Sequence, residues 1–374
     1  MGRGIRLFKI LGIQVSLDYT WFIVFGLVAL SLAHGYFPFY YPGLGGFTYF
    51  LMGLISSLLL FASVLIHEIS HSHTANRLGL EIKEITLFIF GGVARLSREP
   101  EDPKVELKIA IAGPASSILL ALVFWLLKGW AEFAFPSPFA LGILRYLVFI
   151  NIVLVVFNLI PGFPLDGGRV LRAIWWMRTG DVQRATQVTS QIGKGFSMLL
   201  IFLGIFQTLM GNLLGGMWSI IIGMFLQQAA ESGYQQLLVK KALGGIKVDA
   251  VMTRGVVTVE DSYTLERVVE EYFFGYHFVS FPVMSEGSLV GMLTLNDVRA
   301  VPRPQWGTTL VRDVMDVITR DTVLHPGDTA LDALSKMVGL GVGRLPVLDD
   351  GKLVGIVTRR DIMKLMEFKV DLGV

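Results

Sequence analysis

The chain has 374 residues, of which 53% are hydrophobic and 17% are charged, and its mean hydropathy is +0.61. A soluble protein carries about 25% charged residues, so this composition excludes a disordered chain and most soluble folds. The chain contains no cysteine, which excludes disulfide scaffolds, thiolate metal sites and cysteine nucleophiles.

Charged residues are unevenly distributed along the chain. Up to Lys241 there are 18 Lys and Arg against 12 Asp and Glu, whereas after it there are 14 against 18. The density of charged residues therefore about doubles in the last third of the chain. This contrast predicts two domains, a membrane domain over residues 1–241 and a soluble domain over residues 242–374.

A transmembrane helix needs about 20 consecutive, mostly apolar residues. Six segments meet this requirement, and they predict a polytopic α-helical membrane domain: Asp18–His34, Phe47–His71, Val105–Leu127, Phe139–Pro161, Ile192–Met210 and Leu213–Ala230. Alternatively, the last two segments form a re-entrant pair. No signal-peptide cleavage site follows the first segment, so we expect that segment to be retained.

Lysine and arginine in the short loops predict the orientation in the membrane, since cytoplasmic loops are enriched in both. If the N-terminus is cytoplasmic, sixteen of these residues lie on the cytoplasmic side, and only Lys128 and Arg145 lie on the other side. We therefore expect a multi-pass integral membrane protein of the lipid bilayer whose N- and C-termini are both cytoplasmic.

The segment between the second and third predicted spans departs from the helical pattern. Its centre, residues 84–90, is rich in β-branched and aromatic side chains and is followed by Gly91 and Gly92. This pattern predicts a short β element, either a strand or a hairpin. An open strand edge in lipid is costly, so the strand must border protein or a water-filled cavity. The alternative is an interfacial loop without a role.

Three of the six histidines lie in the sequence HEISHSH, residues 67–73. His67 and His71 are four residues apart, so on a helix they share one face and can bind the same metal ion. Glu68 lies beside that face and can take a proton from an attacking water. His73 points away from this face, and we expect His34 to be interfacial. The alternative is that HEISH is the solvated end of a helix.

The end of the fourth predicted span offers a third metal ligand. The sequence from Asn158 to Gly168 contains two prolines and three glycines, which end the helix where the apolar run ends. The second and fourth spans run in the same direction, so Asp166 should reach the same depth as His71. Two histidines and one carboxylate leave one zinc position open, as in catalytic zinc sites. The alternative for Asp166 is a cap of the next helix.

Together, HExxH in one span and N-x-x-P-x-x-P-x-D-G at the end of another resemble the site-2 protease family of intramembrane zinc metalloproteases, over about 240 residues. The resemblance implies an endopeptidase that cleaves transmembrane segments of membrane proteins. Its implied site has one catalytic zinc ion on His67, His71 and Asp166, with Glu68 as the general base.

The same resemblance raises two further points. It implies that Asn158 holds the substrate or the oxyanion. Gly113-Pro-Ala-Ser-Ser117 resembles a family G-P-x-x-N pattern, but Ser117 stands where the family has Asn. We also expect the strand near Ile85–Phe90 to accept an unwound substrate segment by strand addition.

The last 125 residues contain an internal repeat, with copies at about 247–298 and 311–363. Each copy reads as strand, helix, two strands joined by a glycine-containing turn, and helix. The repeat resembles a tandem CBS-domain pair, so we expect a cytoplasmic α/β CBS pair after the membrane domain, with a role in regulating proteolysis.

A CBS pair implies a homodimer and the binding of adenosine nucleotides. Each copy carries the T-x-x-D pattern that in the family contacts ribose and phosphate. The candidate residues are Thr294, Asp297, Thr358 and Asp361. The alternative is that they only cap helices.

The main competing function is a CBS-regulated membrane transporter or channel, in which HEISH and Asp166 would line an ion path. Transporters typically have two broken helices in matching positions, and this sequence shows one. An inactive relative that only binds membrane partners is a third reading, which the intact His67, Glu68, His71 and Asp166 disfavour. There is no nucleic-acid-binding signal.

Overall fold

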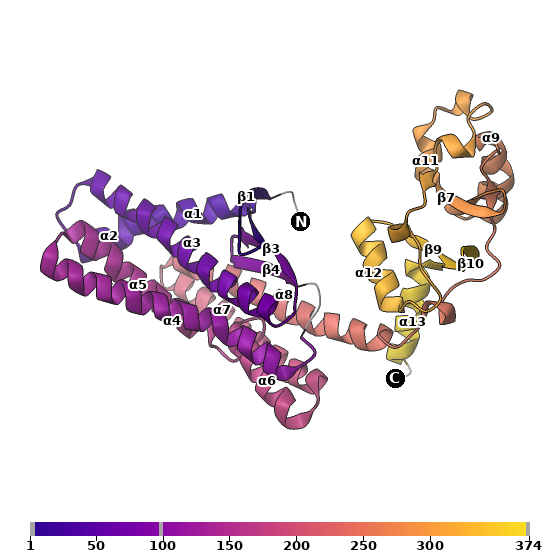
Figure 1. Cartoon of the computed structure of the whole chain (residues 1–374). Helices are drawn as coiled ribbons and strands as arrows, with labels where there is room; N and C mark the ends of the chain where they lie inside the picture. The colour runs from indigo at the N-terminus through magenta and orange to yellow at the C-terminus, as the bar shows by residue number, and fades with distance from the viewer. Residues whose placement is uncertain (1–3, 97–99, 372–374) are drawn as a thin grey trace. The chain divides into compact units, whose positions relative to one another are not determined.

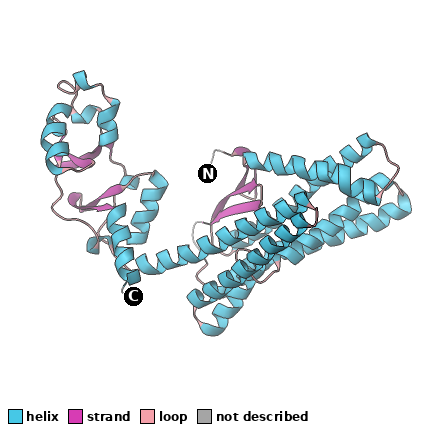
Figure 2. Cartoon of the chain, turned by 180° about the vertical axis from the view of Figure 1, so that it is seen from behind, coloured by secondary structure: helices cyan, strands magenta, loops and turns pink. Residues whose placement is uncertain are grey.

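The computed structural model describes residues 4–96 and 100–371 (Figure 1). The chain divides into two compact units, and the boundary between them falls after Gln235. The first unit consists of long helices and one small sheet, and the second consists of short helices and strands (Figure 2).

In the described part of the chain, five helical segments are long and apolar enough to cross a membrane. The first segment, Tyr19–Tyr40, comprises α1 (Tyr19–Ser31), a π-helical turn (Leu32–Tyr36) and α2 (Phe37–Tyr40). The other four are α3 (Gly46–Arg77), α4 (Pro103–Ala134), α5 (Pro138–Asn158) and α7 (Val182–Leu209). These five overlap the first five predicted spans. The sixth, Leu213–Ala230, lies within α8 (Leu213–Leu243), which continues through a polar end.

Helix α7 begins ten residues before the predicted span at Ile192. Its first turn is capped by Asp181, whose carboxylate accepts a hydrogen bond from the Arg184 backbone N–H at 2.9 Å. Such a cap satisfies a free N–H of the first turn and lets a helix start among polar residues. Hydropathy detects the apolar part of a helix and misses this polar extension.

A four-stranded sheet lies beside the helices of the first unit, with strand order β1-β2-β3-β4. The strands are β1 (Ile5–Ile10), β2 (Ile13–Leu17), β3 (Ile82–Phe88) and β4 (Gly91–Leu96). The β1–β2 and β3–β4 pairs are antiparallel hairpins, and β2 runs parallel to β3. The β element predicted between the second and third spans is therefore a hairpin.

Sequence analysis missed the β1–β2 hairpin. Ile10 pairs with Ile13 across a two-residue turn, in which Leu11 and Gly12 both have positive φ, 50° and 84°. Such turns match the twist of a hairpin and favour glycine. The basic residues of this segment suggest a cytoplasmic flank, and that signal obscured the hairpin.

One face of the sheet packs on the membrane helices. The apolar cluster beneath it contains Ile13, Leu17, Trp21, Val24, Phe61, Ile85 and Leu87, drawn from β2, β3, α1 and α3. Because β3 is paired with β2 on one side and with β4 on the other, it has no free edge for a substrate. The expectation that Ile85–Phe90 accepts a substrate strand is therefore wrong for β3, and the free edge on this side belongs to β4.

In the second unit, the first repeat copy begins with β5 (Val259–Glu260) and a helical segment. That segment consists of α9 (Leu265–Arg267), a π-helical turn (Val268–Phe273) and α10 (Phe274–Tyr276). The copy continues with β6 (Ser280–Ser285), β7 (Ser288–Thr294) and α11 (Leu295–Ala300). The second copy forms α12 (Ala330–Leu340), β9 (Arg344–Asp349), β10 (Lys352–Thr358) and α13 (Arg359–Asp371). The short strand β8 (Asp316–Val317) pairs with β7. Both copies thus show the predicted order, except that a single parallel bridge, Leu324 to Val347, replaces the first strand of copy two.

The two copies exchange their leading segments. Met252, near the start of copy one, packs against Gly355 of copy two, and Met315, near the start of copy two, packs in the same way against Gly291 of copy one. A side chain at either glycine would overlap the methionine sulfur. The two hydrophobic cores are therefore each built from both copies.

Candidate active site

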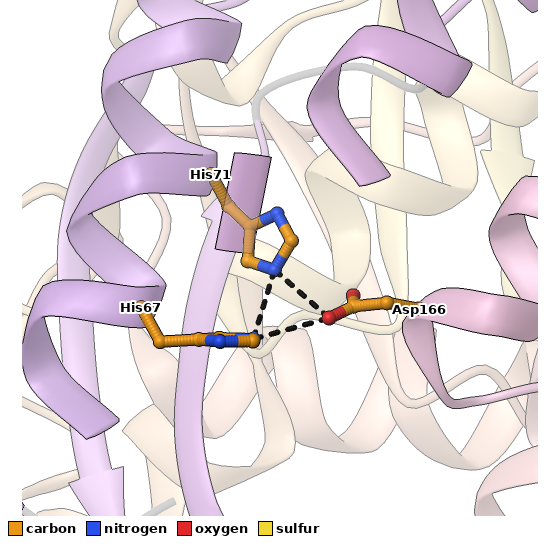
Figure 3. Close-up of side chains that lie close together, drawn as sticks. All are labelled: His67, His71 and Asp166. Carbon is orange, nitrogen blue, oxygen red and sulfur yellow. Dashed lines mark hydrogen bonds and ion pairs between the residues drawn. The ribbon is translucent and has the colours of Figure 1, made fainter. Parts of the chain in front are cut away.

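His67, His71 and Asp166 meet at one point inside the first unit (Figure 3). The Nε2 atoms of the two histidines are 3.2 Å apart, and each lies 3.1 Å from Oδ2 of Asp166. All three residues are at least 93% buried. The structure thus brings together all three predicted metal ligands, whereas His73 and His34 are outside this cluster.

Local sequence explains how the three side chains reach this point. His67 and His71 lie one turn apart on α3, and Asp166 is the first residue of α6 (Asp166–Thr179). The chain between α5 and α6 folds back tightly, so Gly167 and Gly168 lie against backbone atoms of residues 159–163. A side chain at either glycine would overlap this backbone and displace Asp166.

Hydrogen bonds at the far side of each ring orient the two histidines. Nδ1 of His71 lies 2.6 Å from the backbone carbonyl of Ile109, and Nδ1 of His67 lies 3.0 Å from the Ser117 hydroxyl. A carbonyl can only accept, so Nδ1 of His71 carries the proton and Nε2 of the neutral ring presents a lone pair. Metal-ligating histidines in proteins commonly have this second partner.

The geometry of the three atoms fits a zinc ion. In their neutral form the two imidazoles direct lone pairs toward each other and toward the Asp166 oxygen within 3.2 Å, and a cation between the three atoms stabilises this arrangement. Zinc bonds of about 2.0–2.1 Å in tetrahedral geometry place neighbouring ligand atoms about 3.3 Å apart. The observed triangle, with edges of 3.1–3.2 Å, matches this spacing.

Helix α4 packs closely against the two histidine rings. A β-carbon at Gly113 would overlap Nε2 of both His67 and His71, so only glycine allows this approach. Ser117 is fully buried, and its short side chain reaches His67 from where the family pattern has Asn. Neither the role of Ser117 nor that of the Ile109 carbonyl was predicted from the sequence. The G-P pair at residues 113–114 was the sequence signal for close helix packing.

Glu68 lies next to His67 on α3, with its side chain against β4. A β-carbon at Gly92 would overlap Cγ of Glu68. Asn158, in contrast, donates from Nδ2 to the Leu154 carbonyl of its own helix at 3.0 Å. The described contacts therefore place Glu68 beside the ligand cluster and leave Asn158 at the end of α5.

The candidate nucleotide residues of the second unit all take part in helix caps. Asp297 accepts hydrogen bonds from the backbone N–H and the hydroxyl of Thr294, each at 2.7 Å. Asp361 accepts the equivalent bonds from Thr358 at 3.0 and 2.6 Å. In both pairs the accepting atom is Oδ2 of the aspartate.

Sequence models of two known families match this chain. Peptidase family M50 matches residues 55–133 and 134–202, and the CBS domain matches residues 248–303 and 311–367. The protein sll0528 of Synechocystis sp. is 32% identical over 370 residues, which cover 98% of this chain and 96% of that protein.

A protein named zinc metalloprotease from Methanocaldococcus jannaschii is 30% identical over 381 residues, covering 100% of this chain and 99% of that protein. Among solved structures, a site-2 protease from Methanocaldococcus jannaschii is 30% identical and covers 62% of this chain and 95% of its own, with a TM-score of 0.42.

Fold, ligand cluster and sequence relatives together define an integral membrane metallopeptidase with a C-terminal CBS pair. The chain belongs to peptidase family M50, the site-2 protease family of intramembrane zinc metalloproteases. The predicted family, fold class and enzyme class are confirmed, and the transporter or channel alternative finds no support. Membership of this family implies zinc as the metal and membrane proteins as substrates.

Replacing Ser117 by alanine should weaken zinc binding about 10- to 100-fold, the typical effect of losing the outer partner of a metal-ligating histidine. Competition with a chromophoric zinc chelator measures this affinity. Ser116→Ala is the matched control, because the Ser116 hydroxyl donates to the Gly113 carbonyl of its own helix at 2.7 Å. Equal zinc affinity in Ser117→Ala and wild type would contradict the assigned role.

Proposed function

We propose that this protein hydrolyses peptide bonds within transmembrane segments of membrane proteins, with a catalytic zinc ion held by His67, His71 and Asp166. The observation that carries the proposal is the buried triangle formed by the two Nε2 atoms and Oδ2. Bound zinc lowers the pKa of water toward neutrality and polarises a carbonyl.

Glu68 is the proposed general base. It takes a proton from the attacking water and passes it to the leaving amine, a role in which a positioned side chain contributes about 10²- to 10⁴-fold to the rate. Two observations support this role: Glu68 directly follows the ligand His67 on α3, and its side chain contacts Gly92 of β4. We assign Asn158 to substrate contact, as its position at the end of α5 precedes Asp166 by one short loop.

The free edge of β4 is the proposed docking site for the substrate. A transmembrane helix must unwind before hydrolysis, because its backbone groups are bonded to one another. An unwound segment can add to β4 as a fifth strand and satisfy those groups. Since Gly92 of β4 lies against Glu68, a strand added at this edge brings its backbone close to the general base.

We propose that both termini and the CBS pair lie in the cytoplasm, on the strength of the sixteen lysines and arginines on that side. The chain has no cysteine, so a single cysteine introduced at Gly287, in the exposed turn before β7, reports the side directly. Labelling by an impermeant maleimide from outside intact cells would contradict this orientation.

The CBS pair is proposed to regulate proteolysis as a homodimer that binds an adenosine nucleotide at its second copy. Arg344 of β9 is the cross-strand partner of Thr358 of β10. Burial lowers the pKa of the Arg344 guanidinium, and the nearby Asp361 partly offsets that effect. Arg344, Arg359 and Arg360 together offer positive charge suited to binding phosphate. In the first copy, Ser280 occupies the place of Arg344 beside Thr294 and Asp297.

Glu68→Gln should retain one bound zinc ion and reduce cleavage by at least about 10²-fold, since the amide cannot accept the proton. The assay uses purified protein in detergent, a reporter with one transmembrane helix, and mass spectrometry of fragments and bound metal. Asp166→Asn is the control that should lose both zinc and cleavage. Cleavage by Glu68→Gln at the wild-type rate would refute the base assignment.

Proline placed separately at Val93 and Ala94 tests docking on β4. Alternate N–H groups of an edge strand point outward, so one of the two prolines removes a substrate hydrogen bond worth about 1 kcal/mol and slows cleavage about fivefold. Leu7→Pro, on the opposite edge strand, should leave cleavage unchanged. If both proline variants of β4 cleave the substrate at the wild-type rate, the substrate docks elsewhere.

Asp361→Asn should weaken ATP binding to the full-length protein about tenfold, and Asp297→Asn should leave it within twofold, because only the second copy carries the arginines. Calorimetry gives the affinity, and light scattering in detergent gives the oligomeric state. ATP binding that depends on Asp297 alone would contradict the assignment of the site to the second copy. ATP that binds without changing the cleavage rate would contradict the regulatory role.

A further inference from the structure

A buried ion pair joins α4 to α6 near the ligand cluster. Nε of Arg172 lies 2.7 Å from Oε1 of Glu106, and Nη2 donates to the same oxygen. The side chain of Glu106 is 1% exposed and that of Arg172 is 11% exposed. Both donors converge on one carboxylate oxygen, so the pair fixes the distance between the two helices.

Stability alone is a weak reason for such a pair. Burying two charges carries a desolvation penalty for each ion, and an apolar pair of similar volume is often as stable. A hydrogen-bonded pair differs from an apolar contact chiefly in direction, because it holds two side chains in one mutual orientation. The Glu106–Arg172 pair therefore fixes the orientation of α4 relative to α6, and with it the groups that these two helices carry.

On α4, Glu106 shares a face with the groups that orient the histidines. Ile109, Gly113 and Ser117 follow it at three, seven and eleven residues, which is the spacing of one helix face. Ile109 bonds His71, Ser117 bonds His67, and Gly113 touches both rings. This face of α4 thus fixes the two histidines and also binds Arg172.

On α6, Arg172 is six residues after Asp166, within the same short helix. Its guanidinium also lies 5.8 Å from the ring centroid of Phe163, in the loop that leads to Asp166. The backbone N–H of Phe163 donates to the Thr189 carbonyl of α7 at 3.0 Å. Arg172 therefore contacts both the loop before Asp166 and the helix face that holds the histidines.

We propose that Glu106 and Arg172 are a positioning pair that holds Asp166 in register with His67 and His71. The pair joins the element carrying the carboxylate to the face of α4 that orients both imidazoles. It contacts no reacting atom and acts through Asp166. This inference rests on the proposed function, since it takes Asp166 as a metal ligand.

The test compares Glu106→Met, Arg172→Met and the double variant Glu106→Met/Arg172→Met. Each single variant leaves one buried charge of the pair without its partner and can lower stability, whereas the double variant replaces both charges of the pair by apolar side chains. Readouts are zinc affinity by chelator competition, the visible spectrum of the cobalt-substituted protein, and the melting temperature of metal-free protein. Lys128→Met, which breaks the Lys128–Glu132 pair on α4, whose side chains are 28% and 49% exposed, is the matched control.

We expect the double variant to melt close to the wild-type temperature and still bind zinc about 10- to 100-fold more weakly, with cobalt bands shifted toward those of Asp166→Asn. Zinc affinity within twofold of wild type in the double variant would overturn the positioning role. If wild type itself binds neither zinc nor cobalt, the proposed function fails together with the pair. If wild type binds metal and the double variant binds it with the same affinity, only the positioning role of the pair fails.

Discussion

The membrane unit depends on one electrostatic constraint: two imidazole lone pairs and a carboxylate oxygen face one another in a buried, apolar place. That arrangement is favourable only around a cation. Helix α4 maintains it by binding the opposite side of each ring, through Ser117 and the Ile109 carbonyl. The long helices and the sheet serve largely to keep this face of α4 against α3 and α6.

Side-chain identity and spacing were enough to predict that His67, His71 and Asp166 would meet. The Ile109 carbonyl escaped prediction because a backbone oxygen leaves no trace in the residue type. Gly113 and Gly92 escaped it because their contribution is a missing side chain that lets a neighbour approach. Metal ligands are therefore readable from sequence, whereas the groups that orient them become visible only in three dimensions.

The same limit applies to the sheet and to the repeats. Ile85–Phe90 has the composition of a strand, yet only the pairing order shows that both its edges are occupied. The repeat identified two CBS copies, but not that Met252 enters the core of the other copy. Composition specifies which segments form strands or helices. Which partner each segment packs against depends on long-range geometry.

Parallel pairing of β2 with β3 also constrains how the chain crosses the bilayer. Hydrogen-bonded neighbours lie on the same side of a membrane, and the chain between these strands contains two apolar helical segments, Tyr19–Tyr40 and Gly46–Arg77. The polypeptide must cross an even number of times between Leu17 and Ile82, so these two segments insert as an out-and-back pair. The sheet thereby enforces this parity of crossings without reference to the charge of any loop.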